Sequence, residues 1–211
     1  MMKLKHLAYY ICCYIIKFFS FVFYPCKGFG LENIPKDSPF IICPNHISMF
    51  DVVALNMVYT KPMRYMSKAE LFDNKLIGGI LSVFGAFPVK RGMGDVGALQ
   101  NAELMLKNNE PMCIFIEGTR TKNSDASPGK AKSGAVLIAS SVCCDIVPVA
   151  IVYKHAKPRI FSKSYVYFGK PISSTELQIE NNDRNDIRKA ANRIMSTITD
   201  MWKAGTEQCR K

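Results

Sequence analysis

Short apolar runs that alternate with helix-like segments constrain the fold of this chain most strongly. Three runs contain no charged residue, and they lie at 40–43, 112–116 and 146–153. Such runs are typical of strands buried on both faces, which occur in parallel sheets covered by helices. Segments with helical spacing of apolar residues lie at 51–59, 95–107 and 133–141. The alternation predicts the α/β class, with a mixed, mainly parallel β-sheet covered by helices.

Weaker patterns extend this order of elements. Residues 28–39 are turn-rich and predict a linker, whereas 63–66 and 165–168 predict further strands. The glycines between 76 and 87 leave the type of element there open. In a helix predicted over 184–203, one stripe collects Ile187, Ala191, Ile194, Ile198 and Met201. With 211 residues and 48% hydrophobic composition, we expect one compact domain over 28–211.

The N-terminal segment 7–24 is the most apolar part of the chain, and Lys3, Lys5 and His6 precede it. With Lys17 inside it, the segment is near the lower limit for crossing a bilayer, roughly 17 to 25 residues. Its Tyr and Phe content favours a helix that lies in the membrane interface. A true span and an ordinary buried helix remain open. We assign 1–27 as an N-terminal, apolar, membrane-associating helix.

Charge and cysteine content limit the partners. The 28 Lys and Arg residues outnumber 17 acidic ones, and the net charge of +11 favours an anionic partner. Because the basic residues are dispersed, without a basic and aromatic RNA motif, we expect no nucleic-acid binding. The eight cysteines form no C-x-x-C motif and include two neighbouring pairs. This spacing argues against a metal site or a disulfide framework and favours reduced thiols on the cytosolic side.

The segment from Asn45 to Asp51 follows a predicted strand and leads into a helix, a junction where α/β proteins place active sites. A histidine can deprotonate a hydroxyl when a carboxylate holds its other ring nitrogen. His46 and Asp51 are five positions apart, so we expect the histidine on the loop and the aspartate on the first helical turn. By itself the segment also fits a loop in which Asp51 caps the helix and His46 is a surface residue.

Two further polar sites follow apolar runs. Lys90 and Arg91 end the run that begins at Gly85, and together they suit a phosphate, although solvated surface charge is the alternative. The segment from Glu117 to Arg120 follows another run and offers an arginine for phosphate and a carboxylate to orient it. An ordinary turn with an ion pair is the alternative there. Three strand-end sites in one small domain favour a single convergent pocket.

Four motifs occur in a fixed order, and they are N-H-x(4)-D at Asn45–Asp51, G-x-F-x-x-K-R at Gly85–Arg91, E-G-T-R at Glu117–Arg120 and an apolar proline-containing block at Ile146–Ile151. The set covers about residues 28 to 172. It resembles the glycerol-phosphate acyltransferase superfamily, most closely the bacterial 1-acyl-sn-glycerol-3-phosphate acyltransferases. One motif alone would be unspecific, but the ordered set is specific.

The resemblance implies roles for these residues. His46 would be the general base that deprotonates the acceptor hydroxyl for attack on the thioester of acyl-CoA or acyl-carrier protein, with Asp51 holding the imidazole. The acceptor phosphate would be bound by Lys90, Arg91, Glu117, Gly118, Thr119 and Arg120. Asn45 and Pro148 would line the pocket. No covalent enzyme intermediate, cofactor or metal is implied.

By the same resemblance, the expected reaction acylates the sn-2 hydroxyl of lysophosphatidic acid and gives phosphatidic acid, a step of phospholipid biosynthesis. The expected location is the cytoplasmic face of the cell membrane, as a monotopic or peripheral protein. One alternative is the same chemistry on glycerol 3-phosphate or another lysolipid. The other is a non-catalytic peripheral membrane protein that binds anionic lipid through its positive charge.

Overall fold

The computed structural model describes residues 10, 11, 14, 15, 18, 23–90, 96–177, 179 and 183–210. The strands are β1 (Cys26–Phe29), β2 (Phe40–Pro44), β3 (Arg64–Lys68), β4 (Ala86–Val89), β5 (Met112–Cys113), β6 (Asp145–Tyr153) and β7 (Ser164–Phe168). The helices are α2 (Phe50–Val58), α3 (Lys75–Val83), α4 (Val96–Lys107), α5 (Gly134–Val142) and α6 (Arg184–Arg210), with short 3-10 helices η1 (Leu31–Asn33) and η2 (Ala69–Phe72).

The strands form one seven-stranded sheet in the order β1-β7-β6-β2-β5-β3-β4. Neighbouring strands are parallel except β6 and β7, which are antiparallel. The predicted mixed, mainly parallel sheet is therefore confirmed. Strands β2 to β6 all end at one edge, which we call the C-terminal edge. Because β1 and β7 run in the opposite direction, these two strands begin at that same edge.

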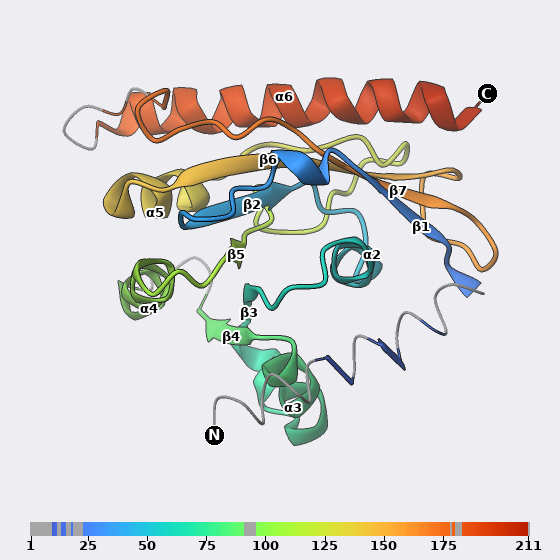
Figure 1. The fold of residues 1–211 in the computed structure, drawn as a ribbon, viewed down its shortest axis with the longest axis horizontal. Coiled ribbons are helices and arrows are strands. Elements are labelled where there is room, and N and C mark those ends of the chain that lie inside the picture. Colours follow the sequence, from blue (N-terminus) through green and yellow to red (C-terminus); the bar gives the residue numbers. More distant parts are fainter. Residues whose placement is uncertain are drawn as a thin grey trace.

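Helices cover both faces of the sheet, and each face has its own apolar core. Figure 1 shows α6 lying along one face and α2 against the other. Side chains of a strand alternate between faces, so Ile41 packs on the α6 side and Ile42 on the α2 side. Burial on both faces explains why the central strands carry uninterrupted apolar sequence.

Strand β1 is the main element that the sequence did not predict, because half of it lies in the predicted linker and it crosses the predicted boundary between 27 and 28. It pairs with β7, from Cys26 opposite Ser164 to Phe29 opposite Tyr167. Gly28 lies so close to α2 that an added Cβ would be 2.0 Å from a methyl carbon of Val58. Tertiary pairing, rather than local sequence, thus makes this segment a strand.

Other boundaries also differ from the predictions. The run 112–116 contains only the two-residue strand β5, although the N–H groups of Ile114 and Ile116 still donate to carbonyls of Ile42 and Pro44 at 2.9 and 3.2 Å. The undetermined segment 76–87 divides into α3 and β4. Helix α6 continues to Arg210 instead of ending at 203, and four of its five predicted apolar positions are buried, with Met201 partly exposed.

The predicted N-terminal helix lies largely outside the described residues, as do Cys12 and Cys13. The described residues of this segment include Tyr10, Ile11, Tyr14, Ile15 and Phe18, which are helical and carry exposed apolar side chains. Among the helices that the structure describes, none is long and apolar enough to cross a membrane. The membrane-associating role of 1–27 stays a prediction.

Candidate active site

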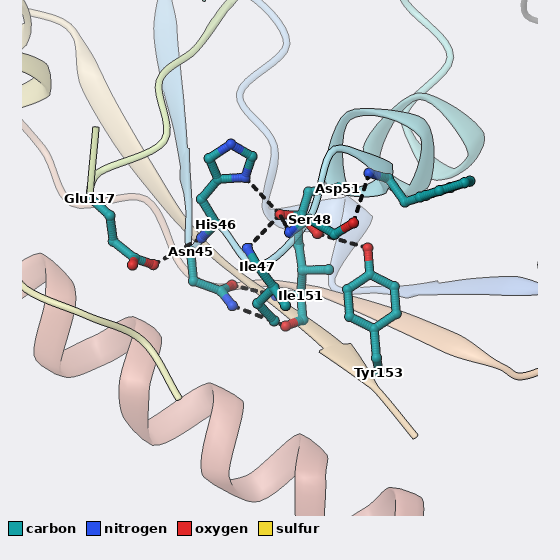
Figure 2. A network of polar contacts seen from close by, with 9 residues as sticks. Asn45, His46, Ile47, Ser48, Asp51, Glu117, Ile151 and Tyr153 are labelled. Carbon is teal, nitrogen blue, oxygen red and sulfur yellow. Dashed lines mark hydrogen bonds and ion pairs between the residues drawn. The ribbon is translucent and has the colours of Figure 1, made fainter. Parts of the chain in front are cut away.

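His46 and Asp51 meet at the C-terminal edge of the sheet. His46 lies in the loop after β2, and Asp51 lies in the first turn of α2, as the spacing predicts. The distance between His46 Nδ1 and Asp51 Oδ2 is 2.7 Å. If Nδ1–H donates to this carboxylate, the neutral imidazole keeps its lone pair on Nε2. Figure 2 shows the other side of the ring directed away from Asp51.

The Asp51 carboxylate is fully buried and accepts hydrogen bonds at both oxygens. Oδ2 accepts from the backbone N–H groups of Ile47 at 2.6 Å and Ser48 at 2.8 Å, in addition to the imidazole. Oδ1 accepts from the Tyr153 hydroxyl at 2.7 Å. A buried carboxylate with several donors has little freedom to rotate, so the imidazole that it holds is also fixed.

Tyr153 is a site residue that sequence reasoning missed. In the pairing of β2 with β6, Pro44 lies opposite Val149, and β6 then continues past the end of β2 to Tyr153. This overhang brings the tyrosine to Asp51. Burial, and next the charge of Asp51, raise the pKa of Tyr153 well above its usual range, so its hydroxyl remains a donor. The only sequence signal was a polar-tipped aromatic at the end of a long apolar run.

Asn45 fixes the start of the histidine loop. Its Nδ2 donates to the carbonyl of Ile151 at 3.1 Å, and its Oδ1 accepts from the Ile151 N–H at 2.7 Å. The side chain therefore imitates a backbone pair and extends the β2–β6 pairing by one step. Asn45 is fully buried. This location makes it part of the frame behind His46, while its predicted place in a substrate pocket stays a prediction.

The segment that follows β5 holds the backbone of His46 on both sides. The His46 N–H donates to Glu117 Oε1 at 2.9 Å, and the His46 carbonyl accepts from the Thr121 N–H at 2.7 Å. Burial raises the pKa of Glu117, while hydrogen bonds from the N–H groups of His46 and Gly129 act in the opposite direction. An added Cβ on Gly129 would lie 2.8 Å from Glu117 Oε2, so a larger residue here would displace that carboxylate.

An aromatic contact further restricts the imidazole. The His46 ring stacks on Phe115, with ring centroids 3.9 Å apart and an interplanar angle of 22°. Hydrogen bonds hold the ring at Nδ1 and the backbone at both peptide groups, so stacking completes the restraint on the side chain. The arrangement can present Nε2 as a proton acceptor, which is the geometry required of a general base.

The residues predicted to bind the phosphate lie at different distances from His46 and Asp51. Thr119 and Arg120 are exposed and follow β5, which pairs directly with β2; the preceding Gly118 has φ of +68°. Lys90 is exposed and follows β4, three positions from β2 in the sheet order. At about 4.8 Å per strand, that offset is roughly 14 Å. Arg91 lies outside the described residues.

Pro148 occupies the interior of β6 and is buried. It lies opposite Cys43 in β2, and its Cγ would be 3.0 Å from a Cβ added to Gly169. Its predicted role in the pocket wall stays a prediction. Within the part of the chain that the structure describes, no group of three or more His, Cys, Asp or Glu residues is placed to hold a metal ion. The described cysteines are free thiols.

Several known proteins are similar to this chain in sequence or in fold. The protein named 1-acyl-sn-glycerol-3-phosphate acyltransferase from Bacillus subtilis is 34% identical over 153 residues, covering 71% of this chain and 75% of that protein. The protein of the same name from Streptococcus pneumoniae is 29% identical over 171 residues, covering 78% of this chain and 61% of that one.

A solved structure supports the fold. The 1-acyl-sn-glycerophosphate (LPA) acyltransferase from Thermotoga maritima superposes with a TM-score of 0.69 at 23% identity, covering 94% of this chain and 79% of that one. The family model described as Acyltransferase matches residues 28–152, which include His46, Asp51, Glu117 and Pro148. This match spans more than half of the chain, and we conclude that the chain belongs to the acyltransferase family.

Proposed function

We propose that this acyltransferase transfers an acyl chain from a thioester donor to the sn-2 hydroxyl of lysophosphatidic acid and forms phosphatidic acid. The observation that carries the proposal is the contact of 2.7 Å between His46 and the buried Asp51 at the C-terminal edge of the sheet. Two relatives, 34% and 29% identical in sequence, are named for this activity. The acyl donor is acyl-CoA or acyl-carrier protein.

In the proposed reaction, His46 Nε2 removes the proton from the acceptor hydroxyl as its oxygen attacks the thioester carbonyl. The C–O bond forms, the C–S bond breaks, and the departing thiolate takes the proton from the imidazolium. Asp51 stabilises that imidazolium through Nδ1. Because the thioester is already activated, positioning of the hydroxyl and removal of its proton supply the main acceleration, without a covalent enzyme intermediate.

Arg120 is the side chain best placed to bind the acceptor phosphate. It follows the strand next to β2, whereas Lys90 follows a strand at the edge of the sheet. An arginine offers a planar pair of donors that matches a phosphate. We assign Lys90, Arg91, Gly118 and Thr119 to the surroundings of the same phosphate. We assign Glu117 to holding the loop of His46, consistent with its contacts to backbone N–H groups.

We further propose that residues 28–211 form the acyltransferase domain and that 1–27 attach it to the cytoplasmic face of the cell membrane. The exposed apolar side chains of Tyr14 and Phe18 support attachment. A monotopic or peripheral arrangement brings the site to acceptors that reside in the membrane, because lysophosphatidic acid partitions into lipid.

The test is product analysis by mass spectrometry with purified full-length protein. It uses acyl-CoA and acyl-carrier protein as donors, and lysophosphatidic acid, glycerol 3-phosphate and other lysolipids as competing acceptors. Phosphatidic acid should be the main product. Preferential acylation of glycerol 3-phosphate would replace the proposed acceptor, and salt-sensitive lipid binding without any acyl transfer would indicate a non-catalytic protein.

The general-base assignment is tested with His46→Ala. Loss of a general base should lower kcat about 10²- to 10⁴-fold. The matched control is His155→Ala, which removes an exposed histidine beyond the end of β6 and should keep normal turnover in detergent micelles. Normal turnover of His46→Ala would show that the general-base assignment is wrong.

A further inference from the structure

The loop between β6 and β7 exposes two apolar side chains between cations. In the segment Lys157–Lys163, Ile160 is 58% exposed and Phe161 is 70% exposed. The cations of this segment, Lys157, Arg159 and Lys163, are exposed as well. These apolar and basic side chains have no role in the catalytic arrangement described above. We call the segment 157–163 the tip loop.

The tip loop is held in place at the end of the N-terminal apolar segment. The Phe161 N–H donates to the Phe23 carbonyl at 2.7 Å, and the two aromatic rings have centroids 5.7 Å apart. Phe161 has φ of +62°, a backbone conformation that is unfavourable for a phenylalanine. Backbone contacts that hold an exposed aromatic residue in an unfavourable conformation point to a function outside the core.

The tip loop lies at the same edge of the sheet as the active site. It follows the end of β6, where Tyr153 contacts Asp51, and Figure 1 shows the connection turning beside the start of β1. A small pocket lies between the loop and α2, and Tyr24, Phe50, Met57, Tyr153, Pro158 and Ser162 are among the residues that line it. A surface that received the tip loop would therefore lie at the edge of the sheet that carries the dyad.

We propose that the tip loop docks on an anionic lipid surface. Ile160 and Phe161 enter the boundary between head groups and acyl chains, where aromatic and aliphatic side chains are favourable. Lys157, Arg159 and Lys163 remain at the level of the lipid phosphates, which attract basic segments. Continuity with the apolar segment through Phe23 and the net charge of +11 favour a bilayer over a protein partner as the occupant.

The docking proposal is independent of the proposed reaction, since vesicle binding is measured without an acyl donor. The local test replaces Phe161 by tryptophan in a Trp202→Phe background, because Trp202 is the only tryptophan in the chain. Vesicles containing phosphatidylglycerol should shift the emission of the introduced indole to the blue, and brominated lipid should quench it. An indole that stays water-exposed while the protein is bound to the vesicles would overturn the proposal.

A second test measures partitioning. The double variant Ile160→Ser and Phe161→Asn should bind phosphatidylglycerol vesicles about tenfold more weakly, because two apolar side chains no longer enter the interface. Asparagine tolerates positive φ, so the substitution preserves the backbone. The matched control is Leu104→Ser, which removes an exposed leucine from α4 and should bind as the parent chain does. Equal weakening in both would indicate a general loss of hydrophobicity rather than docking by the loop.

The cations are tested separately with the triple variant Lys157→Gln, Arg159→Gln and Lys163→Gln. Each basic side chain near an anionic surface contributes about a fivefold gain in affinity, so the variant should bind phosphatidylglycerol vesicles about a hundredfold more weakly. Its binding to pure phosphatidylcholine vesicles should change little. Equal losses on both kinds of vesicle would overturn the assignment of these side chains to lipid phosphates.

Discussion

Tyr153→Phe removes one hydroxyl from the site and keeps the aromatic ring. The hydroxyl donates to Asp51 Oδ1 at 2.7 Å. Among the residues that the structure describes, it is the single donor to that oxygen. Hydrogen bonds to charged groups contribute about 1.5 to 3 kcal/mol when they are buried. We therefore expect the free energy of unfolding to fall by about 2 kcal/mol.

The catalytic effect follows from the loss of restraint on Asp51. Without the hydroxyl, Oδ2 still accepts from Ile47, Ser48 and His46, so the dyad persists but the carboxylate is held on one side only. We expect kcat to fall about tenfold, which corresponds to about 1.4 kcal/mol in the activation free energy. The KM for the acceptor should stay unchanged, because Tyr153 is buried and acts through Asp51.

The assay measures kcat and KM in detergent micelles, together with urea unfolding. The matched control is Tyr65→Phe, which also removes a buried hydroxyl from the α2 side of the core, where Tyr65 accepts from Asn56 Nδ2 at 2.8 Å. This variant should lose stability but keep kcat per folded molecule. If both variants lower kcat equally after correction for the folded fraction, Tyr153 has a structural role and does not position the dyad.

Five other substitutions, two of them for comparison, test the frame and the phosphate site. Gly129→Ala should lower the free energy of unfolding by about 1 to 3 kcal/mol and reduce kcat by displacing Glu117, whereas Gly134→Ala, where an added Cβ meets nothing within 4 Å, should do neither. Burial raises the pKa of Glu117 above its ordinary 4.5, so its contribution to stability falls as pH rises through that raised pKa. The unfolding free energy of Glu117→Gln relative to the parent chain should consequently increase from acidic to neutral pH in urea titrations, and a flat difference would contradict the burial argument. Arg120→Ala should raise the KM for lysophosphatidic acid at least tenfold, and Lys90→Ala less, because hydrogen bonds to phosphate contribute about 1.5 to 3 kcal/mol and Lys90 follows a more distant strand.

Elements buried on both faces carried the clearest signal in the sequence. Strands β2 and β6 have continuous apolar sequence because helices cover both sides of the sheet, and this pattern does not depend on knowing the neighbours. Strand β1 could not be predicted, since Cys26 to Phe29 adopt strand geometry only by pairing with β7. Strand β5 shows the opposite error: an apolar run leaves regular geometry after Cys113 although its next N–H groups still reach β2.

The geometry of the candidate site was only partly accessible for a related reason. The order of motifs implies that His46 and Glu117 both follow parallel strands and thus lie at one edge. It cannot give the register of β6 against β2, in which Pro44 faces Val149 and the surplus length carries Tyr153 to Asp51. A contact that depends on how far one strand extends beyond its neighbour leaves no periodic signal in sequence.

These contacts separate the motif residues into a frame and an open side. Asn45 and Glu117 hold the backbone around the histidine, while Asp51 holds its ring and Tyr153 holds Asp51, all as buried side chains. By contrast, Arg120 remains exposed at the end of the neighbouring strand. Side chains already satisfied by buried hydrogen bonds are poor ligands for a phosphate, because binding would break those bonds. The anionic head group of the acceptor is therefore left to the exposed cations, and the buried carboxylates serve the geometry of one imidazole.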